Sequence, residues 1–261
     1  MPDEEKLAAI RELLPATGAG IYLNTAQAGP LPAETARAMT EAAEWELRTG
    51  RAHPTFLEEA AARLDEARGS LAAILHAPID QLVIAHSAAD ALAAAILGSG
   101  RGSRVSLSAD LEPALRTRLA AVAAASERPA VVTRAWAPPP ETDLVVLPHV
   151  TAAGAVLPIA DLARDAEANG SALLVDGSLA TGAIPVDVEA LGVTAYATDV
   201  HRWLLGPLGV AAIHVQAHAR GPSPAAVRAS LEAGSFHGPS VTGMARSAGW
   251  LAMYVGLDWI T

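Results

Sequence analysis

The sequence predicts an α/β protein with a mainly parallel β-sheet that is covered by helices on both faces. Short apolar runs alternate along the chain with amphipathic or alanine-rich segments of helical period. Some of these runs are continuously apolar, such as DLVVLPHV at 143–150, which is typical of strands buried on both faces. The 261 residues are enough for one large domain with a substantial core.

The elements can be assigned in chain order. Apolar side chains at three- and four-residue spacing predict two amphipathic helices, 32–50 and 55–75. Further helices are expected at 88–97, 112–126, 159–170 and 186–192, the third of them ended by Gly170. Strands are expected at 81–87, 103–110, 129–136, 143–150, 171–178, 194–199 and 209–215. We expect residues 1–20 to form an N-terminal helical segment and residues 21–261 to form the large domain.

Composition excludes several classes of function. The formal net charge of −10 disfavours nucleic acid and anionic membranes as partners. No apolar run reaches the roughly 18 residues that a membrane span needs, and the acidic N-terminus does not read as a signal peptide. Without cysteine there are no disulfides, iron–sulfur clusters, thiolate zinc sites or cysteine nucleophiles. We therefore expect a cytoplasmic protein.

Polar residues gather where the predicted strands end, which is where open α/β sheets bind ligands. Each has a simpler interpretation when taken alone. Asp176 could cap a helix or form a turn, His149 could be a hydrogen-bonded histidine at the sheet edge, and His201 could cap a turn. Together they predict a polar pocket formed by Ser87, His149, Asp176, Thr198, Asp199 and His201.

Four segments resemble the class V aminotransferase family, which includes cysteine desulfurases, selenocysteine lyases, isopenicillin N epimerase-like proteins and the C–S lyase of ergothioneine synthesis. They are IYLNTAQAGPLP (21–32), PHVTAAGAVLPI (148–159), LLVDGSLATGAIPVDVEALG (173–192) and HRWLLGPLG (201–209). Residues 235–260 also look like the long-helix region of the epimerase and lyase branch. The resemblance implies a fold type I large domain that binds pyridoxal 5′-phosphate (PLP), usually as a dimer.

The resemblance also implies roles for individual residues. Asp176 matches the aspartate that pairs with the pyridinium nitrogen, and His149 matches the histidine that stacks on the cofactor ring and helps to move protons. His201 matches a histidine near the phosphate. Ser87, Thr198 and Asp199 stand where neighbours of the phosphate are found.

The sequence departs from the family pattern at the position of the Schiff-base lysine. The family motif His-Lys-Trp is here His201-Arg202-Trp203, and a guanidinium stays protonated and cannot form an imine. The single lysine, Lys6, lies before the first matching segment. Other expected polar residues are replaced by Ala88, Ala89, Ala152 and Leu179. By comparison with the family, we expect the small C-terminal domain to be absent.

Several hypotheses follow. The protein could be a degenerate, catalytically impaired member in which PLP is bound noncovalently or lost, serving as a scaffold or partner subunit. It could instead be an active lyase or epimerase with noncovalent PLP and a small amino-acid substrate. A third possibility is a repurposed metal site formed by His149, Asp176 and His201. We expect a homodimer or a heteromeric complex, because the apolar face left by a missing domain needs cover.

Overall fold

The computed structural model describes residues 4–100, 102–134, 136, 141–217, 221–232 and 239–250. Within these residues, seven strands form one sheet in the order β1-β7-β6-β5-β4-β2-β3. Strands β2 to β6 pair in parallel, whereas β7 runs antiparallel to β1 and β6. The predicted mainly parallel sheet is therefore confirmed. The strands are β1 (Leu82–Ala85), β2 (Val105–Ser108), β3 (Ala130–Thr133), β4 (Leu144–Pro148), β5 (Ala172–Asp176), β6 (Ala195–Asp199) and β7 (Ala211–Val215).

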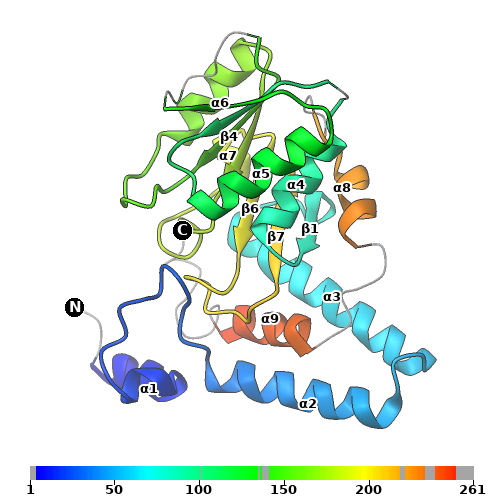
Figure 1. Cartoon of the computed structure of the whole chain (residues 1–261). Helices are drawn as coiled ribbons and strands as arrows, with labels where there is room; N and C mark the ends of the chain where they lie inside the picture. Colours follow the sequence, from blue (N-terminus) through cyan, green and yellow to red (C-terminus); the bar gives the residue numbers. More distant parts are fainter. Residues whose placement is uncertain are drawn as a thin grey trace.

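Helices cover both faces of the sheet (Figure 1). They are α1 (Glu4–Leu13), α2 (Ala33–Thr49), α3 (Pro54–Leu75), α4 (Ala88–Gly98), α5 (Pro113–Ala125), α6 (Ile159–Ala168), α7 (Val188–Leu191), α8 (Pro224–Leu231) and α9 (Pro239–Trp250), with short 3-10 turns at Pro15–Gly18 and Ile79–Gln81. Alternate residues of the strands enter two separate cores, as the two-residue period of a strand requires. One core packs on α4, α5 and α8, and the other packs on α3 and α6.

Helix α9 lies under the loop that follows β6. It packs against α2 and α3, and the hydroxyls of Thr35 and Ser247 lie 2.8 Å apart in this contact. Ser247 also donates a hydrogen bond to the carbonyl of Leu205, in the loop itself, at 3.4 Å. The long helix expected at 235–260 is thus represented by α9, while residues 251–261 lie outside the described part of the chain.

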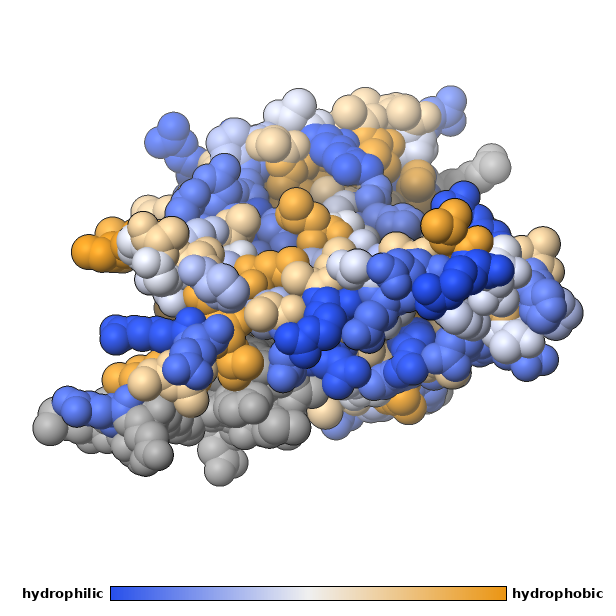
Figure 2. All heavy atoms as spheres, turned by 90° about the horizontal axis from the view of Figure 1, so that it is seen from below, coloured by the Kyte–Doolittle hydropathy of each residue, from blue (hydrophilic) through white to orange (hydrophobic). Residues whose placement is uncertain are grey.

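A groove of about 410 Å³ runs between α2, α3 and α9. The rings of Trp45 and Phe56 stack in it with centroids 5.1 Å apart, and Arg63 pairs with Glu59 and Glu66. Seen from below, this end of the molecule carries mostly hydrophilic side chains with apolar ones between them (Figure 2). The groove lies between helices and not at the strand ends, where ligands of open α/β sheets bind.

Strand β3 and the lengths of the helices complete the description of the fold. Strand β3 is shorter than predicted and lies at the sheet edge, where Val131 and Val132 are exposed. Within the described residues, no helix is both long and apolar enough to cross a bilayer.

Candidate functional site

Three of the predicted site residues line one cavity at the carboxyl edge of the sheet. Ser87 follows β1, Asp176 is the last residue of β5, and Asp199 is the last residue of β6. Because these strands run in the same direction, their ends converge at one edge. The cavity has a volume of about 220 Å³ and is also lined by Glu112 and by residues of α4 and α5.

The Asp176 side chain lines the cavity. It is buried, and its Oδ1 accepts hydrogen bonds from the backbone N–H of Ser178 at 3.1 Å and from the Ser178 hydroxyl at 2.7 Å. Burial raises the pKa of Asp176 to about 6, even though the two hydrogen bonds from Ser178 favour the ionised form. Asp176 therefore changes charge close to neutral pH.

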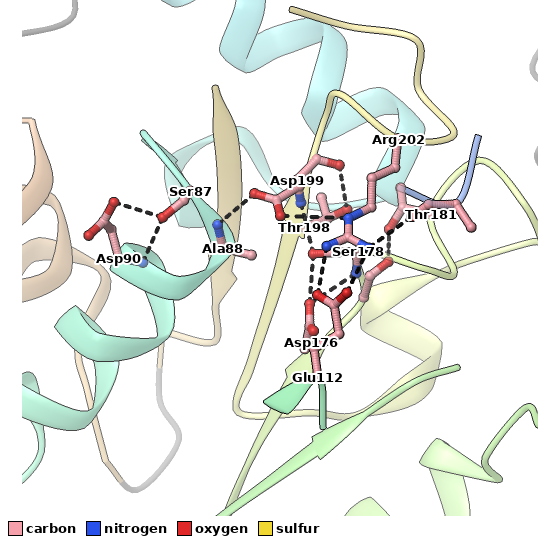
Figure 3. Close-up of polar contacts among 12 residues, drawn as sticks. Ser87, Ala88, Asp90, Glu112, Asp176, Ser178, Thr181, Thr198, Asp199 and Arg202 are labelled. Carbon is pink, nitrogen blue, oxygen red and sulfur yellow. Dashed lines mark hydrogen bonds and ion pairs between the residues drawn. The ribbon is translucent and has the colours of Figure 1, made fainter. Parts of the chain in front are cut away.

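The N-terminus of α4 is bonded to carboxylates of the chain itself (Figure 3). The Ala88 N–H donates to Asp199 Oδ1 at 2.9 Å. Ser87 is the N-cap, accepting from the Asp90 N–H at 3.0 Å and donating its hydroxyl to Asp90 Oδ2 at 2.7 Å. Arg118 in turn pairs with Asp90. The positive end of this helix is thus neutralised internally.

Arg202 is held by three contacts and is largely buried. Its Nη2 donates to Glu112 Oε2 at 2.7 Å and its Nη1 donates to Glu112 Oε1 at 3.4 Å, which makes a bidentate pair. Its Nη1 also donates to the carbonyl of Ala26 at 2.8 Å, and its Nε lies 3.9 Å from Asp199 Oδ2 (Figure 3). The guanidinium is therefore fixed by the protein and is not a free cation.

The segment 21–32 reaches this site because Gly29 permits a close approach. The Gly29 N–H donates to the His201 carbonyl at 2.8 Å, and a Cβ at this position would overlap the carbonyl oxygen of Arg202. Only glycine fits such an approach without displacing the loop. This contact places the Ala26 carbonyl within reach of Arg202.

The predicted histidines do not line the cavity. The Nδ1 of His149 lies 2.9 Å from the Tyr196 hydroxyl, and burial lowers the pKa of His149 to about 4, so its ring is neutral at pH 7. Partial burial lowers the pKa of His201, while the carboxylates of Asp199 and Glu112 act in the opposite direction. Thr198 is buried, and its hydroxyl donates to the carbonyl of Asp199 at 3.3 Å.

The arrangement gives the metal hypothesis no support. Among the described residues, which include His149, Asp176 and His201, no three histidine or carboxylate side chains are grouped so that they could hold a metal ion. The side chain of His149 is directed to Tyr196 instead. The proposed metal site therefore does not form in this structure.

Two residues of the site were not predicted from the sequence. Glu112 immediately precedes α5 and pairs with Arg202, and Ser178 bonds to Asp176 while its Oγ accepts the Asp199 N–H at 3.1 Å. Both follow strands that end at this edge of the sheet, β2 and β5. Their positions after strand ends could have indicated that both residues lie at the site. The hydrogen-bond partners of Glu112 and Ser178 could not be predicted, because they depend on how the loops fold.

The raised pKa of Asp176 predicts a pH-dependent stability. The folded state binds the carboxyl proton more tightly than the unfolded state. The contribution of Asp176 therefore lowers the free energy of unfolding as the pH rises from 3.8 through about 6. At pH 7 the difference in pKa corresponds to about 3 kcal/mol. We expect Asp176→Asn to be more stable than the wild type at pH 7 by up to that amount, and the difference to disappear below pH 4.

Urea unfolding of both proteins between pH 4 and 7 measures this difference. Asp187→Asn is the matched control, because Asp187 caps the exposed start of α7, away from the cavity, and its loss should bring no gain at pH 7. A wild type that is more stable than Asp176→Asn at pH 7, by a margin that grows with pH, would contradict the assignment.

Comparison with known proteins agrees with this architecture. Residues 132–258 match the family model described as Aminotransferase class-V. A probable cysteine desulfurase of Methanothermobacter thermautotrophicus is 28% identical over 227 residues, which are 81% of this chain and 57% of that protein. Isopenicillin N epimerase of Streptomyces clavuligerus is 38% identical over 77 residues, which are 29% of this chain and 19% of that protein.

Solved structures share the fold. A structure of a C-DES mutant with glycine covalently linked to the PLP cofactor superimposes with a TM-score of 0.83 at 20% identity, covering 99% of this chain and 76% of that one. The cysteine desulfurase CsdA of Escherichia coli gives a TM-score of 0.76 at 21% identity, covering 97% of this chain and 73% of that one. The matched sequence segments support the class V aminotransferase family for this chain, and the solved structures show that it shares their fold.

Proposed function

We propose that this cysteine desulfurase-like chain is catalytically impaired in covalent PLP chemistry and acts as a scaffold or partner subunit. The observation that carries the proposal is the Arg202 guanidinium, held by Glu112 and by the Ala26 carbonyl at the position matching the family lysine. A guanidinium stays protonated and does not supply the neutral amine that imine formation requires. The chain spans 57% of the first curated relative, so activity and substrate of the whole protein remain part of the proposal.

The residues of the pocket fit PLP only in part. Bound PLP supplies a pyridine ring that withdraws electrons and an aldehyde that reacts with amines. The buried Asp176 carboxyl suits the ring nitrogen. Arg202 does not suit the aldehyde, and the Asp199 carboxylate stands where the phosphate would need a donor. We therefore propose PLP as a ligand that is held noncovalently or has been lost, and we derive no catalytic step through it.

The alternative is an active lyase or epimerase that uses noncovalent PLP and a small amino-acid substrate. It would need a proton-transfer group close to the ligand. His149 is neutral at pH 7, as a general base must be, but its Nδ1 faces Tyr196 and it does not line the cavity. This geometry favours the impaired function over the active one.

Ile21 and Leu23 are 90% and 89% exposed in the segment that contacts the Arg202 loop, and adjacent exposed aliphatic side chains favour a protein interface. We propose that this segment contacts a second copy of the chain or a different partner subunit. Either partner would lie next to the candidate site.

We expect the wild type to be a dimer at tens of micromolar concentration, as measured by light scattering. Replacing Ile21 and Leu23 by serine should shift it to a monomer, because the apolar area that drives association is removed. Ile79→Ser, at an exposed position in a separate 3-10 turn, is the control and should leave the dimer intact. A monomeric wild type contradicts self-association through this surface, and a dimer that persists in the double serine variant contradicts the assignment of the interface to Ile21 and Leu23.

The lysine position can be tested directly. Wild-type protein incubated with PLP or with pyridoxal should show no visible imine band, and borohydride should trap no pyridoxyl adduct at residue 202. Arg202→Lys restores an amine in a largely buried setting, where its pKa can fall. We expect that variant to form an imine with pyridoxal, detected by absorbance and by mass spectrometry of the trapped peptide.

Arg164→Lys, exposed on α6, controls for the addition of a lysine as such and should not yield the same stoichiometric adduct. Reading the adduct by peptide separates residue 202 from the other amines of the chain, including that of Lys6. Purification of the wild type with PLP covalently attached to the chain would refute the impaired function.

A further inference from the structure

The N-terminus of α4 has the features of an anion site, but it already holds an anion. Helix N-termini attract phosphate because their first N–H groups lack partners and the helix dipole is positive there. In this chain the Ala88 N–H is bonded to Asp199 Oδ1 at 2.9 Å. Asp199 is the last residue of β6, so a different element of the fold delivers this carboxylate to the helix.

Asp199 is held in place at its backbone and at its side chain. Its N–H donates to Ser178 Oγ at 3.1 Å, and that hydroxyl donates to Asp176 Oδ1 at 2.7 Å. Its other carboxylate oxygen, Oδ2, lies 3.9 Å from Arg202 Nε, and its side chain is only 14% exposed. Figure 3 shows Asp199 between the start of α4 and Arg202. An incoming anion would have to break this arrangement to reach the Ala88 N–H.

The charges around the cavity do not compensate an added phosphate. Arg118 is the one cationic side chain among the described residues that line the cavity, and it pairs with Asp90. Arg202, beside the cavity, is paired with Glu112. Asp176, Asp199 and Glu112 all line the same space. A phosphate dianion placed there would face several carboxylates at short range, where repulsion is weakly screened.

We propose that Asp199 acts as an internal anion at the start of α4 and excludes phosphorylated ligands from the cavity. The pocket would then admit an uncharged or cationic ring compound in preference to its phosphate ester. This inference rests on the proposed relation of the cavity to PLP pockets and, of the two states of PLP proposed above, implies that PLP has been lost. It does not depend on imine formation at residue 202.

Pyridoxine and pyridoxine 5′-phosphate are suitable probes, because neither has an aldehyde and neither can react with an amine. Calorimetry or equilibrium dialysis should show that the wild type binds the phosphate ester no more tightly than pyridoxine. Asp199→Asn removes the negative charge with little change in shape. We expect this variant to favour the phosphate ester by at least about tenfold, as expected when a close like charge is removed from a partly buried site.

Asp187→Asn removes another helix-capping carboxylate, at α7, and should leave the wild-type preference unchanged. Near-ultraviolet circular dichroism confirms the fold of each variant, and Asp199→Ser replaces Asp199→Asn if the latter does not fold. A wild type that prefers the phosphate ester overturns the inference. So does a folded Asp199 variant that gains no preference or binds neither probe. Each of these results is independent of whether Arg202→Lys forms an imine.

Discussion

The ion pair between Arg202 and Glu112 is the contact on which the site depends. It joins the loop after β6 to the start of α5, and the bond from Arg202 to the Ala26 carbonyl adds the segment that precedes α2. Three parts of the chain that are distant in sequence therefore meet at one guanidinium. Because Arg202 is largely buried, loss of its partner would leave a charge with poor solvation.

The same principle explains the rest of the cavity. Parallel strands bring Asp176 and Asp199 to one sheet edge, and each carboxylate needs donors because Asp176 is buried and the Asp199 side chain is only 14% exposed. Ser178 donates a hydrogen bond to Asp176, and the first turn of α4 donates one to Asp199. Donors at strand ends and helix N-termini can bind a ligand in such folds. In this chain they are hydrogen-bonded to its own carboxylates. The proposed loss of covalent cofactor chemistry and the proposed exclusion of phosphate both follow from this internal pairing.

Periodicity was sufficient to predict the alternating elements, because strands buried on both faces and amphipathic helices leave strong local signals. The convergence of Ser87, Asp176 and Asp199 also followed from the sequence, since each stands at the end of a strand. The pairing of Arg202 with Glu112 did not, because the two residues are 90 positions apart and meet only through loop geometry. His149 was expected in the same pocket, but its Nδ1 is directed to Tyr196, and this orientation depends on side-chain packing that no motif encodes.

A double-mutant cycle on Arg202 and Glu112 tests the central claim most directly. The free energies of unfolding of the wild type, Arg202→Met, Glu112→Gln and the double variant are measured in urea at pH 7. If the guanidinium is committed to this internal partner, the coupling free energy should be about 1–3 kcal/mol, as for contacting charged groups with a bidentate geometry. A coupling close to zero would show that Arg202 is not held by Glu112 in solution, and would contradict the account of an internally paired site.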